Sequence, residues 1–233
     1  AFAMDVSLEE LVRDGAERSV EHSFLLQHLD ELPADAISKI YALVMGQSDE
    51  PSERVNRIAL IGLRGAGKST LGRALARKLD FPFVELVREI EREAGLSINE
   101  VFSLSGQASY RRLERQCLEN TVNRFEKVVI SVGGSLVSEP GTYERLLKRC
   151  YTVWLKADPE EHMKRVIGQG DYRPMAGNVQ AMDDLRRILA DREALYGKAD
   201  TIIDTSADSV EDSLQKLLDD SQIRSKLDKV IHE

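Results

Sequence analysis

The sequence carries one short segment whose residues suit it to holding phosphate groups. It reads Gly62-Leu63-Arg64-Gly65-Ala66-Gly67-Lys68-Ser69, with Thr70 following. Glycine lets the backbone curl so that successive N–H groups point at phosphate oxygens. The Lys68 amine is expected to reach the β and γ phosphates and the Ser69 hydroxyl to ligate Mg²⁺. All of these residues are therefore predicted to bind ATP with Mg²⁺, and Lys68 is also a candidate catalytic residue.

Such a loop needs a strand before it and a helix after it, and the sequence supplies both. Residues 57–61 (RIALI) are a short apolar run typical of a buried strand, and residues 67–78 carry leucines at helical spacing. A glycine-rich turn that happens to end in Lys-Ser is the alternative interpretation. The strand and helix around the loop argue against it.

Strand and helix patterns alternate along the rest of this region. Strands are expected at 57–61, 81–86, 127–132, 151–155 and 201–203, and helices at 67–78, 88–94, 108–125, 142–148, 159–167, 181–196 and 209–218. This alternation implies right-handed crossovers between parallel strands. We therefore predict an α/β fold, a three-layer sandwich in which a five-stranded parallel sheet has helices on both faces.

The chain divides into four predicted segments. Residues 1–14 and 15–56 have helical patterns, and the second of these segments ends in a polar stretch typical of a linker. Residues 57–206 form the α/β domain, and residues 207–233 are a terminal helix with a polar tail.

The composition argues against several classes of protein. Of the 233 residues, 42% are hydrophobic and 31% charged, which is ordinary for a globular protein. No apolar run reaches the roughly 18 to 20 residues of a membrane span, and no signal-peptide pattern is present, so we expect a cytoplasmic protein without a membrane partner. The net charge of −8 argues against a broad nucleic-acid surface. No catalytic role is assigned to the histidines, which are His22, His28, His162 and His232.

From Arg57 to about Ser206 the chain resembles shikimate kinase, in separated motifs that occur in that family's order. The segment Phe83-Val84-Glu85-Leu86-Val87-Arg88-Glu89-Ile90-Glu91 is similar to one in which the family has two aspartates flanking one residue. This resemblance implies that Glu85 lies near Mg²⁺. Val87 stands where the family has the carboxylate that grips the substrate hydroxyl.

Two further motifs imply a site for the carboxylate of a small ligand. Tyr110-Arg111, with Glu114 beyond it, is similar to the family's Phe-Arg pair and its glutamate. Arg192, four residues before Tyr196, matches the family's helix arginine. By this resemblance Arg111 and Arg192 bind the carboxylate, for which two guanidinium groups are well shaped.

Two more segments complete the resemblance. Gly133-Gly134-Ser135 is similar to the family's glycine triplet, altered in its last member, and implies contact with the ligand. Arg173 precedes Pro174 as the family's lid arginine precedes a proline. Arg173 is therefore predicted to meet the phosphates and to act in catalysis.

Val87 argues against ordinary shikimate kinase activity. A valine side chain can neither orient the acceptor hydroxyl nor receive its proton. A hydrogen bond to a charged group is worth about 1.5–3 kcal/mol, so shikimate use is expected to fall by at least roughly one to two orders of magnitude. The less polar pocket would suit an apolar ring that carries an anionic group.

The N-terminal region resembles a second group of proteins. Residues 1–12 are similar to the last helices of a phage-repressor-type helix-turn-helix domain, and residues 17–23 and 57–67 resemble the regulators of benzoate catabolism. Those regulators join a DNA-binding domain, through a helical linker, to a shikimate-kinase-like module that senses benzoyl-CoA. The resemblance implies a homodimeric repressor that binds an aromatic acyl-CoA and reaches DNA only through a domain upstream of this chain.

Two functional hypotheses follow. The first is an ATP-binding, effector-sensing domain of a transcriptional regulator, with phosphotransferase activity reduced or lost. The alternative is an active shikimate kinase, which converts shikimate to shikimate 3-phosphate and in which Glu85 or water covers for the missing carboxylate.

Overall fold

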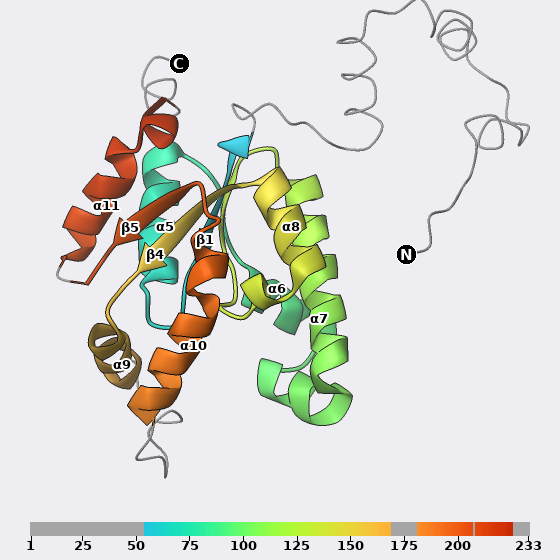
Figure 1. The fold of residues 1–233 in the computed structure, drawn as a ribbon. Coiled ribbons are helices and arrows are strands. Elements are labelled where there is room, and N and C mark those ends of the chain that lie inside the picture. Colours follow the sequence, from blue (N-terminus) through green and yellow to red (C-terminus); the bar gives the residue numbers. More distant parts are fainter. Residues whose placement is uncertain (1–53, 169–180, 207, 226–233) are drawn as a thin grey trace, which may run out of the picture. The chain divides into compact units, whose positions relative to one another are not determined.

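The computed structural model describes residues 54–168, 181–206 and 208–225 (Figure 1). The predicted segment 1–14, nearly all of 15–56 and the end of 207–233 lie outside these residues. Arg173 lies outside them as well. The boundaries of the four segments therefore stay predictions.

A five-stranded parallel sheet forms the middle layer, as predicted. Its strands are β1 (Arg57–Ile61), β2 (Phe83–Glu85), β3 (Val128–Ser131), β4 (Tyr151–Lys156) and β5 (Thr201–Asp204). Their order across the sheet is β2-β3-β1-β4-β5. The central strand β1 pairs with β3 and β4, so that Ala59 lies opposite Ile130 on one side and Thr152 on the other. Because both faces of β1 are covered, the strand is buried and apolar from Ile58 to Ile61, after the half-buried Arg57.

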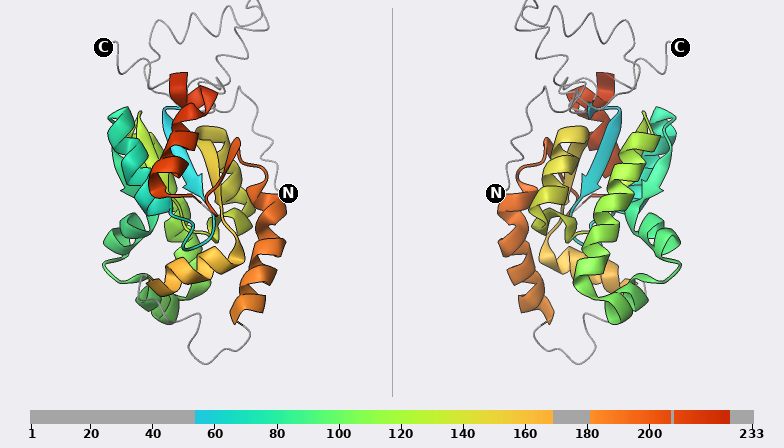
Figure 2. Two further views of the ribbon diagram at one scale, coloured as in Figure 1. Left: turned by 90° about the vertical axis from the view of Figure 1, so that its left-hand side faces the viewer. Right: turned by 90° about the vertical axis from the view of Figure 1, so that its right-hand side faces the viewer.

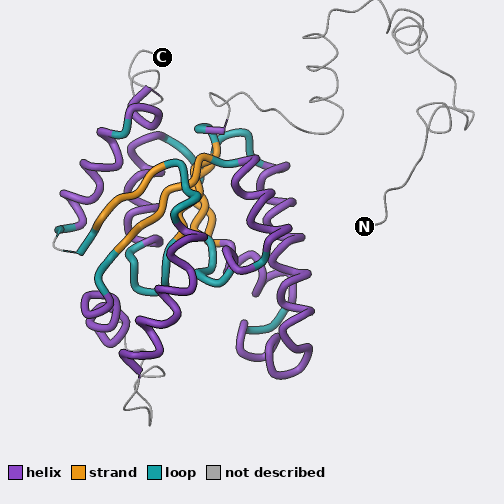
Figure 3. The backbone as a smooth tube through the Cα atoms, in the orientation of Figure 1, coloured by secondary structure: helices purple, strands orange, loops and turns teal. Residues whose placement is uncertain are grey.

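Helices cover both faces of the sheet (Figures 1, 2 and 3). On one face Leu71 and Leu75 of α5 (Lys68–Leu79) and Leu217 of α11 (Val210–Asp219) pack against the sheet. On the other face lie α7 (Ile98–Arg124), α8 (Pro140–Arg149) and α10 (Ala181–Tyr196), and their buried residues include Leu118 and Leu146. The remaining elements are α6 (Leu86–Ala94), the short 3₁₀ helix η2 (Leu136–Ser138) and α9 (Pro159–Gly168).

Helix α7 is longer than predicted and is broken once. The predicted helix covered residues 108–125, whereas α7 begins at Ile98. Ser97 caps its first turn, because the side chains of Ser97 and Glu100 each accept a hydrogen bond from the other residue's backbone N–H. Gly106, with φ 74° and ψ 176°, interrupts the helix between its two segments. A non-glycine residue rarely adopts this conformation, so the break requires glycine.

Both cysteines of the chain belong to the buried core of the domain. Cys117 and Cys150 are both buried and form no disulfide. Among the residues that the structure describes, no helix has the length and apolar character needed to cross a membrane.

Two helical glycines should respond in opposite ways to alanine. A Cβ added to Gly72 in α5 would lie 2.4 Å from Cε2 of Phe83 and 3.1 Å from Cδ1 of Leu60. A Cβ added to Gly141 in α8 would meet no described atom within 4 Å. We expect Gly72→Ala to lower the free energy of unfolding by about 1–3 kcal/mol through overpacking. We expect Gly141→Ala to raise it by up to about 1 kcal/mol, because alanine favours the helix. Urea unfolding of both variants measures this, and an unchanged midpoint for Gly72→Ala would contradict the close packing of α5 on the sheet.

Candidate active site

The phosphate loop, the end of β2 and the turn after β3 meet at one edge of the sheet. Parallel strands present their carboxyl ends at the same edge, and ligands of such sheets bind where the strand order changes direction, here around β1. A cavity of about 680 Å³ lies there. Of the residues predicted to bind nucleotide, metal or substrate, those that line it are Arg64, Gly65, Gly67, Lys68, Ser69, Thr70, Glu85, Val87, Gly133, Gly134 and Ser135.

The shape of the phosphate loop depends on its glycines. Gly62 has φ 137°, and a Cβ there would come within 2.6 Å of the carbonyl oxygen of Leu155 on β4. Gly67 is the N-cap of α5 in the left-handed conformation, and no side chain of the described residues caps the helix at this point. The N-terminus of α5, with its partial positive charge, therefore faces the cavity where phosphate groups are predicted to bind.

Lys68 ties the two ends of the loop together. Its Nζ donates hydrogen bonds to the carbonyl oxygens of Gly62 and Leu63, both at 2.8 Å. Burial of the ammonium lowers its pKa to about 8, and the positive charge of Arg64 adds to this effect. The ammonium is therefore less well solvated than a surface lysine, and an anionic phosphate beside it would favour its charged form.

The two predicted metal ligands are in direct contact. The Ser69 hydroxyl donates a hydrogen bond to Oε1 of Glu85, and Nη2 of Arg73 lies 2.7 Å from Oε2 of the same carboxylate. Within the described residues no group of three or more His, Cys, Asp or Glu side chains could hold a metal by itself. Mg²⁺ commonly takes one or two protein oxygens and completes its shell with phosphates and water, so Ser69 and Glu85 fit this ion.

Apolar and charged side chains both line the cavity near Val87, and the charged ones include Arg88 and Glu91 of the same helix, α6. Val87 lines it together with Phe102 and Tyr110, whose rings stack with centroids 4.6 Å apart. Phe102 is 40% exposed, whereas Tyr110 is buried. This aromatic wall has no carboxylate at position 87, although Glu91, one turn farther along α6, lines the same cavity.

The turn after β3 links the phosphate loop to α10. The hydroxyl of Tyr196 donates to the carbonyl oxygen of Gly134 at 2.7 Å, and Nη1 of Arg192 lies 3.3 Å from the same oxygen. A Cβ on Gly134 would lie 3.0 Å from the carbonyl oxygen of Gly62, so the turn packs directly on the loop. Arg192 is thus beside the predicted substrate turn.

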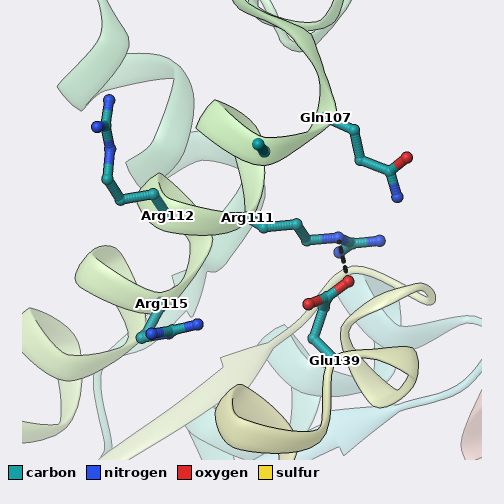
Figure 4. Close-up of a pocket in the computed structure, with 6 residues that line it drawn as sticks. Gln107, Arg111, Arg112, Arg115 and Glu139 are labelled. Carbon is teal, nitrogen blue, oxygen red and sulfur yellow. Dashed lines mark ion pairs between the residues drawn. The ribbon is translucent and has the colours of Figure 1, made fainter.

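Arg111, the other predicted carboxylate ligand, lines a neighbouring cavity of about 540 Å³ (Figure 4). Its Nη1 donates to Oε2 of Glu114 at 2.5 Å, and its Nε lies 3.1 Å from Oε1 of Glu139. Burial raises the pKa of Glu114, while hydrogen bonds from Arg111 and Tyr110 oppose the shift. The sequence motifs did not indicate that Glu139 contacts Arg111.

His162 is the residue at the site that the sequence did not indicate. It lies in α9 within the charged stretch PEEHMKR, yet its side chain is 1% exposed. It makes a hydrogen bond to the backbone of Arg64 in the phosphate loop, and its Nδ1 has no hydrogen-bond partner among the residues that the structure describes. Burial, with the positive charge of Lys68 next in importance, lowers its pKa to about 4.

Burial of the His162 imidazole leads to a prediction of how the free energy of unfolding depends on pH. Because the pKa of His162 is lower in the folded than in the unfolded chain, the unfolded chain binds more protons between about pH 4 and 6.5. Unfolding becomes easier as the pH falls through this window, by up to about 3 kcal/mol from this residue. His162→Gln should lose less stability than the wild type over this range in urea unfolding experiments. Parallel pH curves for the two proteins would show that the imidazole does not titrate as inferred.

Comparison with known proteins gives one consistent family. The shikimate kinase family model matches residues 64–222. A shikimate kinase from Paramagnetospirillum magneticum is 32% identical over 192 residues, which are 82% of this chain and 94% of that protein. One from Nitrobacter winogradskyi is 37% identical over 146 residues, 63% of this chain and 67% of that protein.

Solved structures agree with the sequence relatives. The shikimate kinase from Acinetobacter baumannii, solved in complex with shikimate, has 31% identity and a TM-score of 0.64, over 72% of this chain and 95% of the other. That from Bacteroides thetaiotaomicron has 34% identity and a TM-score of 0.63, over 70% and 96% of the two chains. With the phosphate loop, Glu85 and the Gly133 turn assembled around one cavity, this chain belongs to the shikimate kinase family.

Proposed function

We propose that this chain is an ATP- and Mg²⁺-dependent phosphotransferase of the shikimate kinase type, which phosphorylates a hydroxyl of a small carboxylic acid. The observation that carries the proposal is the single cavity that joins Lys68 and Ser69 to the turn at Gly133–Ser135. Shikimate is the first substrate to test, because the relatives are shikimate kinases and one of them was solved with shikimate.

The loop side of the cavity supplies positioning and charge. Backbone N–H groups at the start of α5 and the Lys68 ammonium would hold the β and γ phosphates. Ser69 and Glu85 would hold Mg²⁺, which neutralises charge on the phosphate oxygens when bound. Arg173, outside the described residues, is proposed to close over the phosphates. These residues would orient the bond between the γ phosphorus and its leaving oxygen toward the acceptor.

The acceptor side would orient the acid. Arg192 beside Gly134, and Arg111 in the separate cavity of Figure 4, are the candidate partners of its carboxylate. In the transfer step the acceptor oxygen bonds to the γ phosphorus as the bond to ADP breaks. The hydroxyl proton would pass to water or to Glu85, because Val87 cannot accept it. We therefore expect slow turnover of shikimate.

The aromatic wall of the cavity favours a second candidate function. Val87, Phe102 and Tyr110 would suit an aromatic ring better than a ring bearing several hydroxyls. In this alternative the chain is the effector-sensing domain of a transcriptional regulator, binds ATP and an aromatic acyl-CoA, and contacts DNA through a domain upstream of this chain. Homodimer formation and a cytoplasmic location belong to the same proposal. It ranks second because the related proteins are named as shikimate kinases.

Restoring a carboxylate at position 87 tests the kinase proposal. We expect Val87→Asp to raise kcat/KM for shikimate by roughly ten- to a hundredfold, because one charged hydrogen bond to the acceptor is regained. A coupled assay that follows ADP formation with ATP, Mg²⁺ and shikimate measures this change.

Val87→Asn is the matched control, since it is polar and of similar size but carries no negative charge. It should gain much less than Val87→Asp, and Lys68→Ala should abolish turnover in both backgrounds. Shikimate-dependent turnover that is undetectable in the wild type and in Val87→Asp would count against the kinase. Calorimetric binding of benzoyl-CoA in that case would support the sensor instead.

A further inference from the structure

The guanidinium of Arg111 pairs with two carboxylates that come from different elements, Glu114 and Glu139. Figure 4 shows the pair with Glu139. Glu114, one turn along α7, is 1% exposed, and Glu139, at the start of α8, is 30% exposed. The Arg111 side chain itself is 13% exposed. Two negatively charged carboxylates therefore already pair with the Arg111 guanidinium, which is largely shielded from solvent.

The two contacts differ in quality. Glu114 receives a hydrogen bond from Nη1 of Arg111 at 2.5 Å and another from the Tyr110 hydroxyl at 3.1 Å. The Nε of Arg111 is buried and makes no aligned hydrogen bond with any described atom, although Oε1 of Glu139 is 3.1 Å away. Glu114 is thus a fixed partner. Glu139 attracts Arg111 by charge without completing its hydrogen bonding, so a better-aligned carboxylate could replace it.

Hydrogen bonds hold the backbone of Glu139 in place, whereas its side chain could adopt a second position near the N-terminus of α8. Its N–H donates to the carbonyl oxygen of Leu136 at 3.0 Å, and its carbonyl oxygen accepts from the N–H of Tyr143 at 2.9 Å. Glu139 is the N-cap of α8, and its side chain makes no capping hydrogen bond to the residues described. A carboxylate at a helix N-terminus is electrostatically favourable, so a displaced Glu139 side chain could remain near α8.

We infer that Glu139 determines specificity by competing with a ligand's carboxylate for Arg111. The inference rests on the proposed function, because it takes Arg111 as a partner of the acid. Glu114 and Glu139 already pair with Arg111, so a third carboxylate at this guanidinium is repelled by both, while Arg112 and Arg115 attract it to the cavity that they line. A ligand acid binds Arg111 only when its geometry satisfies the guanidinium better than Glu139 does, and neutral ligands are unaffected.

The competition predicts a gain in affinity that depends on the ligand's charge. We expect Glu139→Gln to lower the Kd of shikimate by about tenfold, because a neutral amide competes poorly for a guanidinium. The Kd of the methyl ester of shikimate, which has no carboxylate, and that of ATP should not change. Isothermal titration calorimetry of each ligand against both proteins measures the difference.

Two variants serve as controls. Glu119→Gln removes a carboxylate from α7, where Glu119 pairs with Arg145 instead, and should leave the Kd of shikimate unchanged. Glu139→Asp keeps the charge and should stay closer to the wild type than Glu139→Gln. A purely structural role for Glu139 would shift the Kd of acid and ester alike.

The outcomes separate the two proposals. Equal shikimate affinity in the wild type and Glu139→Gln overturns the competition and leaves the proposed function intact. If neither protein binds shikimate, the proposed acid site fails and the competition fails with it. Modification of Arg111 by phenylglyoxal, followed by mass spectrometry, adds a readout without a ligand: it should be faster in Glu139→Gln than in Glu119→Gln, and equal rates overturn the inference.

Discussion

The two hydrogen bonds from the Lys68 ammonium to the carbonyl oxygens of Gly62 and Leu63 hold the phosphate loop in its curled form. They are possible only because Gly62 adopts φ 137° against the Leu155 carbonyl, which a side chain would block. The cost is a poorly hydrated cation with a pKa of about 8. A bound triphosphate would contact that cation directly. The free-energy cost of burying the Lys68 ammonium is therefore offset only when an anion binds.

The rest of the site is packed onto this loop from three directions. Glu85 at the end of β2 holds Ser69, Gly134 after β3 approaches Gly62, and His162 from α9 bonds to the backbone of Arg64. Each element ends at the same edge of the sheet, because the strands are parallel. The fold therefore brings the loop, the predicted metal ligands and the predicted substrate turn together around one cavity.

Local patterns predicted the strands and most helices, because apolar runs and helical spacing reflect burial on the two faces of the sheet. The first segment of α7 was missed, since it is short and Gly106 separates it from the regular pattern that follows. Ser69 and Glu85, which the motifs predicted to lie near Mg²⁺, are in contact. The motifs could not indicate His162 or Glu139, whose contacts join residues far apart in sequence and depend on how helices pack.

Both proposed functions require ATP at the loop, and at the site they differ in the ligand proposed to bind beside Val87 and the aromatic wall. The most direct test is calorimetric titration of the protein with ATP and Mg²⁺ between pH 7 and 9, in buffers of different ionisation enthalpy. We predict proton uptake that increases with pH, because the triphosphate raises the pKa of Lys68 from about 8, and no such uptake in Lys68→Ala. Absence of binding at millimolar ATP, or equal proton uptake in the wild type and Lys68→Ala, would contradict the inferred role of Lys68.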